Sequence, residues 1–205
     1  MRVKYKPKIL PKILSYLFDD FNYLPQQRIA RSVIQNSRIM QFPISKIEGE
    51  DYMWFRLGET AIHFSEVQLL GDASQHGFNG IFISATFNKS FTSETVVLPN
   101  NFRLRTKKKL AQHFNDFKIV KLEDKDFNRE FIVLSTDQIE SRYILSTSMM
   151  ARMLDYKNKT GKPVSFSFTG NLLHCAVPNA LNLFEPPLFE SFYNFQLFQK
   201  KLRCS

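Results

Sequence analysis

The chain is poor in the residues that build most recognisable catalytic sites. It has two cysteines, and because Cys175 lies in an apolar run and Cys204 is the penultimate residue, they indicate neither a disulfide framework nor a metal cluster. None of the four histidines pairs with another at metal-ligand spacing, and no HExxH or GxSxG motif occurs. The seven glycines form neither a GxGxxG nor a P-loop pattern. We therefore expect no cofactor, and the sequence favours a non-enzymatic protein.

Long apolar runs are missing as well. No stretch approaches the roughly 18 apolar residues that span a bilayer, and no apolar region with a small-residue cleavage site follows Met1. We expect a soluble, unsecreted chain in a reducing compartment. What the chain does have is 21 phenylalanines among 205 residues that are 43% apolar, enough to bury a full core. We predict an N-terminal helical segment over residues 1–42 and an α+β domain over residues 43–205, joined in one compact unit.

The N-terminal segment has the spacing of helices. Apolar residues recur at three- and four-residue intervals from Ile9 to Phe21, which predicts a helix over residues 8–24. We expect a second helix to begin at Pro25, and its apolar pattern ends near Pro43. The N-terminal segment is therefore predicted to be a helical pair. The amphipathic first helix has two possible uses, docking on a membrane surface and packing against the core, and we favour packing.

From Ile44 the pattern changes to strands with short turns. A phase slip in the second strand, between Phe64 and Val67, predicts a β-bulge near Ser65 and Glu66. We expect an α+β fold in which helices pack on an antiparallel sheet of roughly six to eight strands, compatible with a pleckstrin-like half-barrel. The strands with the clearest patterns are Tyr52–Leu57, Thr60–Leu70, Gly80–Asn88, Glu94–Leu98 and the hairpin Val164–Phe168 and Leu172–Val177. Helices are expected at Leu104–Phe114 and Leu188–Leu202.

The stretch from Lys118 to Lys159 predicts a strand, an acidic turn at 123–126, a central strand at Phe131–Leu134 and two helical segments. Asp137 followed by Glu140 is typical of a helix N-terminus, and 146–148 provide a second cap. Gly161 ends the helical part. Asp137, Glu140 and Arg142 together resemble a catalytic group, but charges that complement a helix dipole explain them better.

Residues 120–162, VKLEDKDFNREFIVLSTDQIESRYILSTSMMARMLDYKNKTGK, carry a resemblance to a known family. Together with the blocks Gly49-Glu50-Asp51 and Leu183-Phe184-Glu185-Pro186, they resemble the bacterial family catalogued as domain of unknown function 3137. The resemblance extends from about Tyr5 to about Phe195. It departs from the family pattern at Ser141 and Ser148, where alanine and proline are usual. The resemblance implies an architecture and an association with a membrane, and it implies no reaction.

The net charge of +9 is concentrated in three windows. Residues 1–12 and 102–109 hold five basic residues each and residues 196–203 hold three, with no acidic residue in any of them. Such windows are typical of proteins that bind a phospholipid surface or a nucleic acid. The alternative is a solvated surface that keeps the protein soluble. The candidate contacts to an anionic surface are Lys4, Lys6, Lys8, Lys12, Arg103, Arg105, Lys107, Lys108, Lys109, Lys200 and Lys201.

These observations lead to one main hypothesis and two alternatives. The main hypothesis is a binding or scaffolding domain at the cytoplasmic face of a bacterial inner membrane, with the membrane or a membrane protein as its partner. The first alternative is an enzyme of unrecognised type, which would bring His63, Glu66 or Asp137 together in a deep pocket. The second alternative is a nucleic-acid-binding protein.

Overall fold

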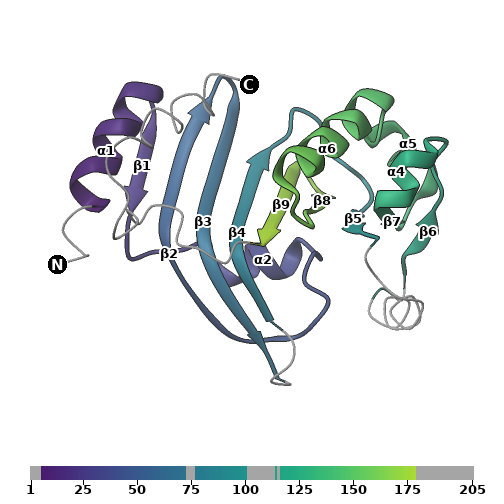
Figure 1. Cartoon of the computed structure of the whole chain (residues 1–205), viewed down its shortest axis with the longest axis horizontal. Helices are drawn as coiled ribbons and strands as arrows, with labels where there is room; N and C mark the ends of the chain where they lie inside the picture. The colour runs from purple at the N-terminus through teal and green to yellow at the C-terminus, as the bar shows by residue number, and fades with distance from the viewer. Residues whose placement is uncertain (1–5, 73–76, 101–113, 115, 179–205) are drawn as a thin grey trace.

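The computed structural model describes residues 6–72, 77–100, 114 and 116–178, and these form a mixed α+β structure built on one large sheet (Figure 1). Nine strands make up that sheet, and every neighbouring pair is antiparallel. From one edge to the other the order is β1 (Phe21–Leu24), β2 (Ile44–Leu57), β3 (Thr60–Gly71), β4 (Gly77–Thr86), β9 (Leu172–Pro178), β8 (Ser165–Thr169), β5 (Thr95–Pro99), β7 (Phe131–Ser135) and β6 (Lys118–Val120).

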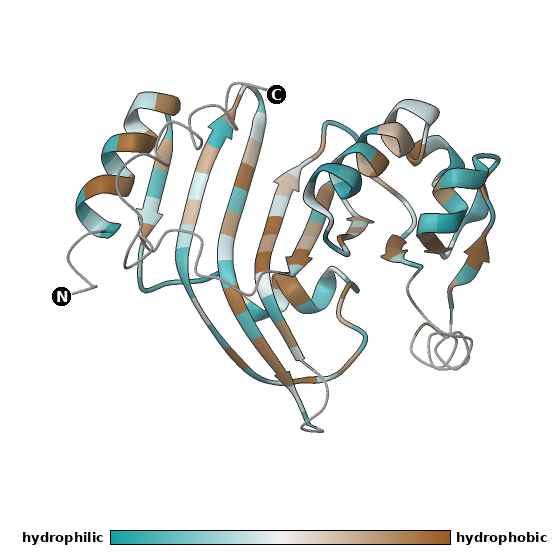
Figure 2. Cartoon of the chain, in the orientation of Figure 1, coloured by the Kyte–Doolittle hydropathy of each residue, from teal (hydrophilic) through white to brown (hydrophobic). Residues whose placement is uncertain are grey.

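Helices cover both faces of the sheet. The described helices are α1 (Lys6–Leu17), α2 (Arg31–Asn36), α4 (Lys125–Glu130), α5 (Gln138–Ile144) and α6 (Thr147–Thr160). Phe64 of β3 packs both against the cluster under α1 and against the large core cluster under α4 and α6, so these helices share one face. Ile34 of α2 packs with Phe82 and Ala176 on the opposite face. Figure 2 shows hydrophobic residues recurring along β4 and β9, in the middle of the sheet between α1 at one end and α4, α5 and α6 at the other.

The sheet has one strand more than the upper limit expected from the sequence. The additional strand is β1, which lies inside the segment predicted as a helix over residues 8–24. Helix α1 ends at Leu17, just before Asp19 and Asp20, and Phe21 then pairs with Phe55 of β2. Phe18 stacks on Phe55 with ring centroids 4.2 Å apart. The apolar spacing that continues past Leu17 therefore serves a strand, and the two N-terminal helices are not consecutive.

The predicted bulge is present on the neighbouring strand. Pairing between β2 and β3 shifts between Glu50 and Met53, while Glu66 and Phe64 are only two residues apart on β3. The extra residue thus belongs to β2, and β3 pairs with β4 without interruption. Asp51 occupies the bulge with a φ of 57°, a left-handed conformation that aspartate tolerates better than most residues. The phase slip in β3 is a change of the buried face, because Phe64 packs under α1, α4 and α6 whereas Val67 packs with Ile34 of α2 on the other face.

The helix signals of the central stretch are confirmed. Asp137 accepts hydrogen bonds from the amides of Ile139 and Glu140, and Ser146 accepts one from the amide of Met149. Gly161 ends α6 with a φ of 64°. The acidic turn differs from the prediction, because Asp124 caps the short helix α4 there. Only Phe127 of α4 is buried, so the helix has too few apolar residues to produce a recognisable period.

Several expectations remain untested. The helices predicted at Leu104–Phe114 and Leu188–Leu202 lie outside the described residues, apart from Phe114. The division at residue 42 and the pleckstrin-like half-barrel stay predictions. Among the helices described, none is both long enough and apolar enough to cross a bilayer.

Candidate binding sites

The structure describes only three of the candidate anionic-surface contacts, and all three lie on α1. Lys8 and Lys12 are exposed, whereas Lys6 is 9% exposed and faces the protein interior. The expectation of an outward-facing charge is therefore not met for Lys6. The remaining candidates lie outside the described residues: Lys4, Arg103, Arg105, Lys107, Lys108, Lys109, Lys200 and Lys201. Whether they share a face with α1 stays a prediction.

Helix α1 has a buried face and a basic, aromatic outer face. Leu10 and Leu14 pack against Tyr23 and Met53. Residues at four-residue intervals share a side of a helix, so Lys8, Lys12 and Tyr16 form an exposed stripe, which we call the α1 stripe. Tyr16 is 84% exposed, and α1 contains no acidic residue.

Lys6 ties α1 to the bulge of β2. Its Nζ atom lies 2.7 Å from Oδ2 of Asp51 and 3.3 Å from Oε1 of Glu50. Asp51 is fully buried, and its Oδ1 accepts a hydrogen bond of 2.5 Å from the hydroxyl of Tyr23. Burial alone would lower the pKa of Lys6, but its hydrogen bond to Asp51 and the charges of Asp51 and Glu50 raise it overall. Burial and the neighbouring Asp51 carboxylate also raise the pKa of Tyr23. The ammonium and the phenol therefore both keep their protons.

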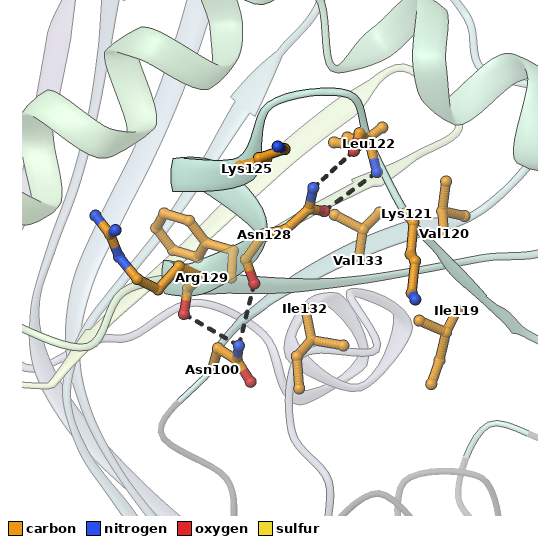
Figure 3. A pocket seen from close by; sticks show the side chains of 11 residues that line it. Asn100, Ile119, Val120, Lys121, Leu122, Lys125, Asn128, Arg129, Ile132 and Val133 are labelled. Atoms are coloured by element: carbon orange, nitrogen blue, oxygen red, sulfur yellow. Dashed lines mark hydrogen bonds between the residues drawn. The ribbon is translucent and has the colours of Figure 1, made fainter.

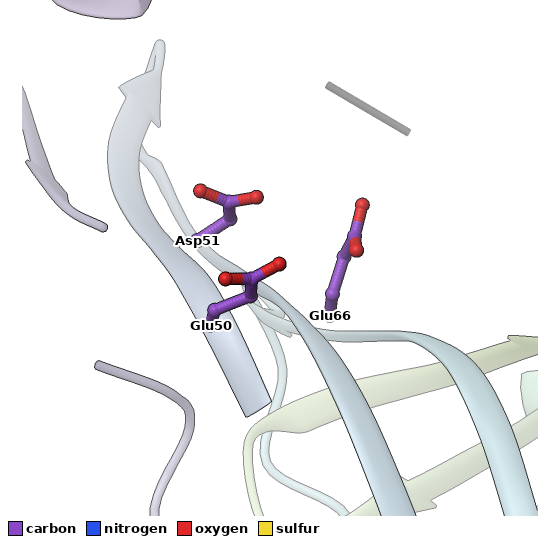
Figure 4. A group of neighbouring side chains, drawn as sticks. All are labelled: Glu50, Asp51 and Glu66. Carbon is purple, nitrogen blue, oxygen red and sulfur yellow. The ribbon is translucent and has the colours of Figure 1, made fainter. Parts of the chain in front are cut away.

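The carboxylate of Glu66 lies beside the carboxylates of Glu50 and Asp51 (Figure 4). One carboxylate oxygen from each of Glu50, Asp51 and Glu66 lies within 4.8 Å of the others. Oxygen ligands of this kind suit hard cations such as Ca²⁺. However, the ammonium of Lys6 already supplies positive charge at Asp51, and Tyr23 occupies the second oxygen of that carboxylate. The arrangement is explained as the anchor of α1.

A pocket of about 370 Å³ lies at the other end of the sheet, where β6 and β7 separate (Figure 3). The two strands pair over three residues each, and the pairing ends at Val120 and Val133. Beyond Val120 the chain leaves β6, forms α4 and returns to the sheet as β7, and the pocket is the space between these three segments. Six of its lining residues are apolar and three are basic: Lys121, Lys125 and Arg129.

Asn128 holds this pocket open. Its Oδ1 accepts a hydrogen bond from the amide of Leu122, and its Nδ2 donates to the carbonyls of Leu122 and Asp124. The side chain thus satisfies backbone groups that a longer β6 would have paired with β7. On the opposite wall, Nδ2 of Asn100 donates to the carbonyls of Asn128 and Arg129.

The proposed catalytic residues do not converge. Nδ1 of His63 forms a hydrogen bond of 2.8 Å with the hydroxyl of Tyr52, and burial lowers the pKa of the imidazole. Glu66 lies three residues further along the same strand, and so on the opposite face of the sheet. Asp137 caps α5. Glu140 accepts hydrogen bonds from the amides of Thr92 and Ser93 and supports that loop.

The central histidine and cysteine are structural as well. His174 is 1% exposed, its Nε2 lies 3.2 Å from the hydroxyl oxygen of Thr169, and burial lowers its pKa to about 4. Cys175 lies on the opposite face of β9, and burial raises the pKa of its thiol to about 12. A thiol with that pKa is protonated at neutral pH and is a poor nucleophile.

Two residues of these sites were missed by the sequence analysis. Asp51 gives no periodic signal, and its position after Gly49-Glu50 in a strand is the only hint of a left-handed residue. Asn128 lies between the predicted turn at 123–126 and the predicted strand Phe131–Leu134, in a segment to which no structure was assigned. A side chain that forms hydrogen bonds with the backbone of its own loop has no characteristic sequence spacing, so the sequence does not reveal it.

Comparisons with known proteins give one family and one distant fold. No curated protein matches the chain at a significant level. A solved structure of the mycobacterial trehalose monomycolate transport factor A, TtfA, is similar with a TM-score of 0.49 and 10% sequence identity, over 89% of this chain and 82% of that one. A similarity at this level carries no argument about function. The family model described as a protein of unknown function, DUF3137, matches residues 76–204. Because this match spans more than half of the sequence, the chain belongs to the DUF3137 family.

Proposed function

We propose that this chain is a non-enzymatic binding domain that contacts acidic phospholipids at the cytoplasmic face of a bacterial membrane. The observation that carries the proposal is the α1 stripe, in which Lys8, Lys12 and Tyr16 are exposed on a helix without acidic residues. The apolar face of α1 packs on the sheet, so the contact would be made by its basic and aromatic outer face, through attraction to acidic headgroups.

The positive charges of the α1 stripe would attract an acidic phospholipid surface strongly enough to contribute to binding. A lysine close to an acidic leaflet contributes about 1 kcal/mol, an attraction that salt screens within about 10 Å at 0.1 M. Tyrosine is enriched at membrane–water interfaces because its ring is apolar and its hydroxyl is polar. Tyr16 and the neighbouring Leu17, which is 41% exposed, would add an apolar contribution that salt does not weaken.

The anchor of α1 supports the same proposal. Lys6 holds the first turn of α1 against the bulge of β2, while Leu10 and Leu14 hold the next turns against the sheet. The helix therefore has its apolar face occupied, and it offers its polar face to a surface. A rigidly held contact helix loses less conformational entropy on binding than a free one.

The test is co-sedimentation with vesicles of phosphatidylglycerol or of phosphatidylcholine across a range of salt concentrations. We expect binding to the acidic vesicles that weakens with salt, and a loss of about tenfold in the Lys8→Gln/Lys12→Gln variant. The matched control is Lys89→Gln/Arg152→Gln, which removes the same charge from exposed positions outside α1. Equal, salt-insensitive behaviour on both lipids would overturn the proposal. So would tight binding to duplex DNA or RNA with no binding to acidic vesicles.

A further inference from the structure

We propose that the pocket between β6 and β7 binds a small organic anion with an aliphatic chain, of the class represented by a fatty-acid carboxylate. The pocket is open to one side and has a volume of about 370 Å³, which lies at the lower end of the range for small-molecule sites. It lies at the opposite end of the sheet from α1, so the inference is independent of the proposed membrane contact.

The walls of the pocket provide an apolar surface. Ile119 of β6 and Ile132 of β7 supply it on one face of the sheet, whereas the side chains of Val120 and Val133 point to the other face, into the core under α4 and α6. Ile119 remains 50% exposed although it lines the same space. An isoleucine left half in water beside a pocket gains from an apolar ligand that covers it.

The polar groups at the pocket select the charge of the ligand. The side chain of Asn128 is fully occupied by backbone groups, and the amide nitrogen of Asn100 is occupied by two carbonyls. Arg129 forms ion pairs with Asp126 and Glu130. Within the described part of the chain, the ammonium groups of Lys121 and Lys125 have neither an ion pair nor a side-chain hydrogen bond, and no carboxylate lines the pocket.

The arrangement of these groups matches an amphiphile. Figure 3 shows Lys121 and Ile119 together on one side of the space, with Asn100 and Arg129 on the other and Lys125 above. A chain that lies against Ile119 and Ile132 would place its head group on the side of the space that holds Lys121. A neutral chain would gain nothing from the ammonium groups, which would stay hydrated, and an anion without a chain would leave the apolar wall in water.

The experiment is a titration of the whole chain with octanoate, followed by the amide chemical shifts of the pocket residues in NMR spectra. Octanol serves as the neutral chain and acetate as the anion without a chain. We expect octanoate to bind about fivefold or more tightly than either of them. Acetate or octanol binding as tightly as octanoate would overturn the proposal.

Variants separate the two parts of the site. We expect Lys121→Gln/Lys125→Gln to weaken octanoate binding about fivefold and to leave octanol unchanged, and Ile119→Ser to weaken both. The control Lys89→Gln/Arg152→Gln removes the same charge elsewhere, and the Lys8→Gln/Lys12→Gln variant, which tests the membrane proposal, should bind octanoate as the wild type does. Since all these side chains are exposed, the variants are expected to fold. Unchanged octanoate affinity in the double lysine variant would also overturn the proposal.

Discussion

The two ends of the sheet are held together by different kinds of interaction. At one end, α1 rests on a small apolar cluster and on a buried ion pair between Lys6 and Asp51. At the other end, α4 and α6 cover a cluster of 14 buried apolar residues. Apolar burial tolerates variation in geometry, whereas a buried charge pair depends on both partners being present in one arrangement. We therefore expect the first end to be specific and fragile, and the second end to supply most of the stability.

The largest expected effect tests the apolar end. Phe127 of α4 is fully buried and its ring lies 4.9 Å from that of Phe131. We expect Phe127→Ala to lower the free energy of unfolding by about 4 kcal/mol, because it leaves a cavity in a packed core. Urea denaturation followed by circular dichroism measures the loss. Tyr143→Ala, at an 81% exposed position of the same end, should change the stability by less than about 0.5 kcal/mol.

The second prediction tests the ion pair. Asp51→Asn keeps the shape of the side chain and a residue that tolerates the left-handed backbone, but leaves Lys6 with only the half-exposed Glu50 as its counterion. We expect a loss of about 3 kcal/mol in the free energy of unfolding. Adding Lys6→Met should recover part of it, and hydrogen exchange should locate the loss in α1 and β1. A loss below about 1 kcal/mol with unchanged exchange would mean that the apolar cluster alone holds α1.

The third prediction concerns the strands between the two ends. His174 stays neutral in the folded protein until the pH falls to about 4, whereas an unfolded histidine takes up a proton below about 6.5. The unfolded state therefore binds more protons in this window, and stability falls as the pH drops from 6.5 towards 4. Between pH 7 and pH 5 we expect His174 to account for a loss of about 2 kcal/mol. The measurement is the difference between wild type and His174→Gln at the two pH values, and parallel losses in both would contradict it.

The smallest effect concerns a helix cap at the apolar end. Asp137 accepts hydrogen bonds from two amides of α5, so Asp137→Ala should cost about 1 kcal/mol, and Asp137→Ser should cost less. Thermal unfolding of the two variants beside the wild type measures the difference. If Asp137→Ala were more damaging than Phe127→Ala, the apolar end would depend on polar contacts after all.

Apart from α4, the apolar end is also the one that could be predicted from the sequence. Its strands alternate or run apolar over a few residues, and its helices start at Asp137 and Ser146 and stop at Gly161, all of which are signals within one turn or one strand. The β8–β9 hairpin turns at Gly170, whose φ of 58° a residue with a side chain rarely adopts.

The anchored end could not be predicted in the same way. Lys6 and Asp51 are 45 residues apart, and each alone reads as an ordinary surface charge. Strand β1 has four residues, and its apolar positions continue the helical period of α1. The pocket at the other end was missed for the same reason, since it arises where the pairing of β6 with β7 stops. Contacts between distant segments leave no period in the sequence.

The bulge in β2 changes how this long strand tolerates insertion and deletion. In a regular strand the loss of one residue turns every later side chain to the wrong face. Here the loss of Asp51 would restore an even ladder opposite Ser65 and keep the later residues on their present faces. The sheet would survive, but α1 would lose its only fully buried electrostatic partner in the described chain. Relatives that lack this residue should therefore pair β2 with β3 normally and attach their first helix by other means.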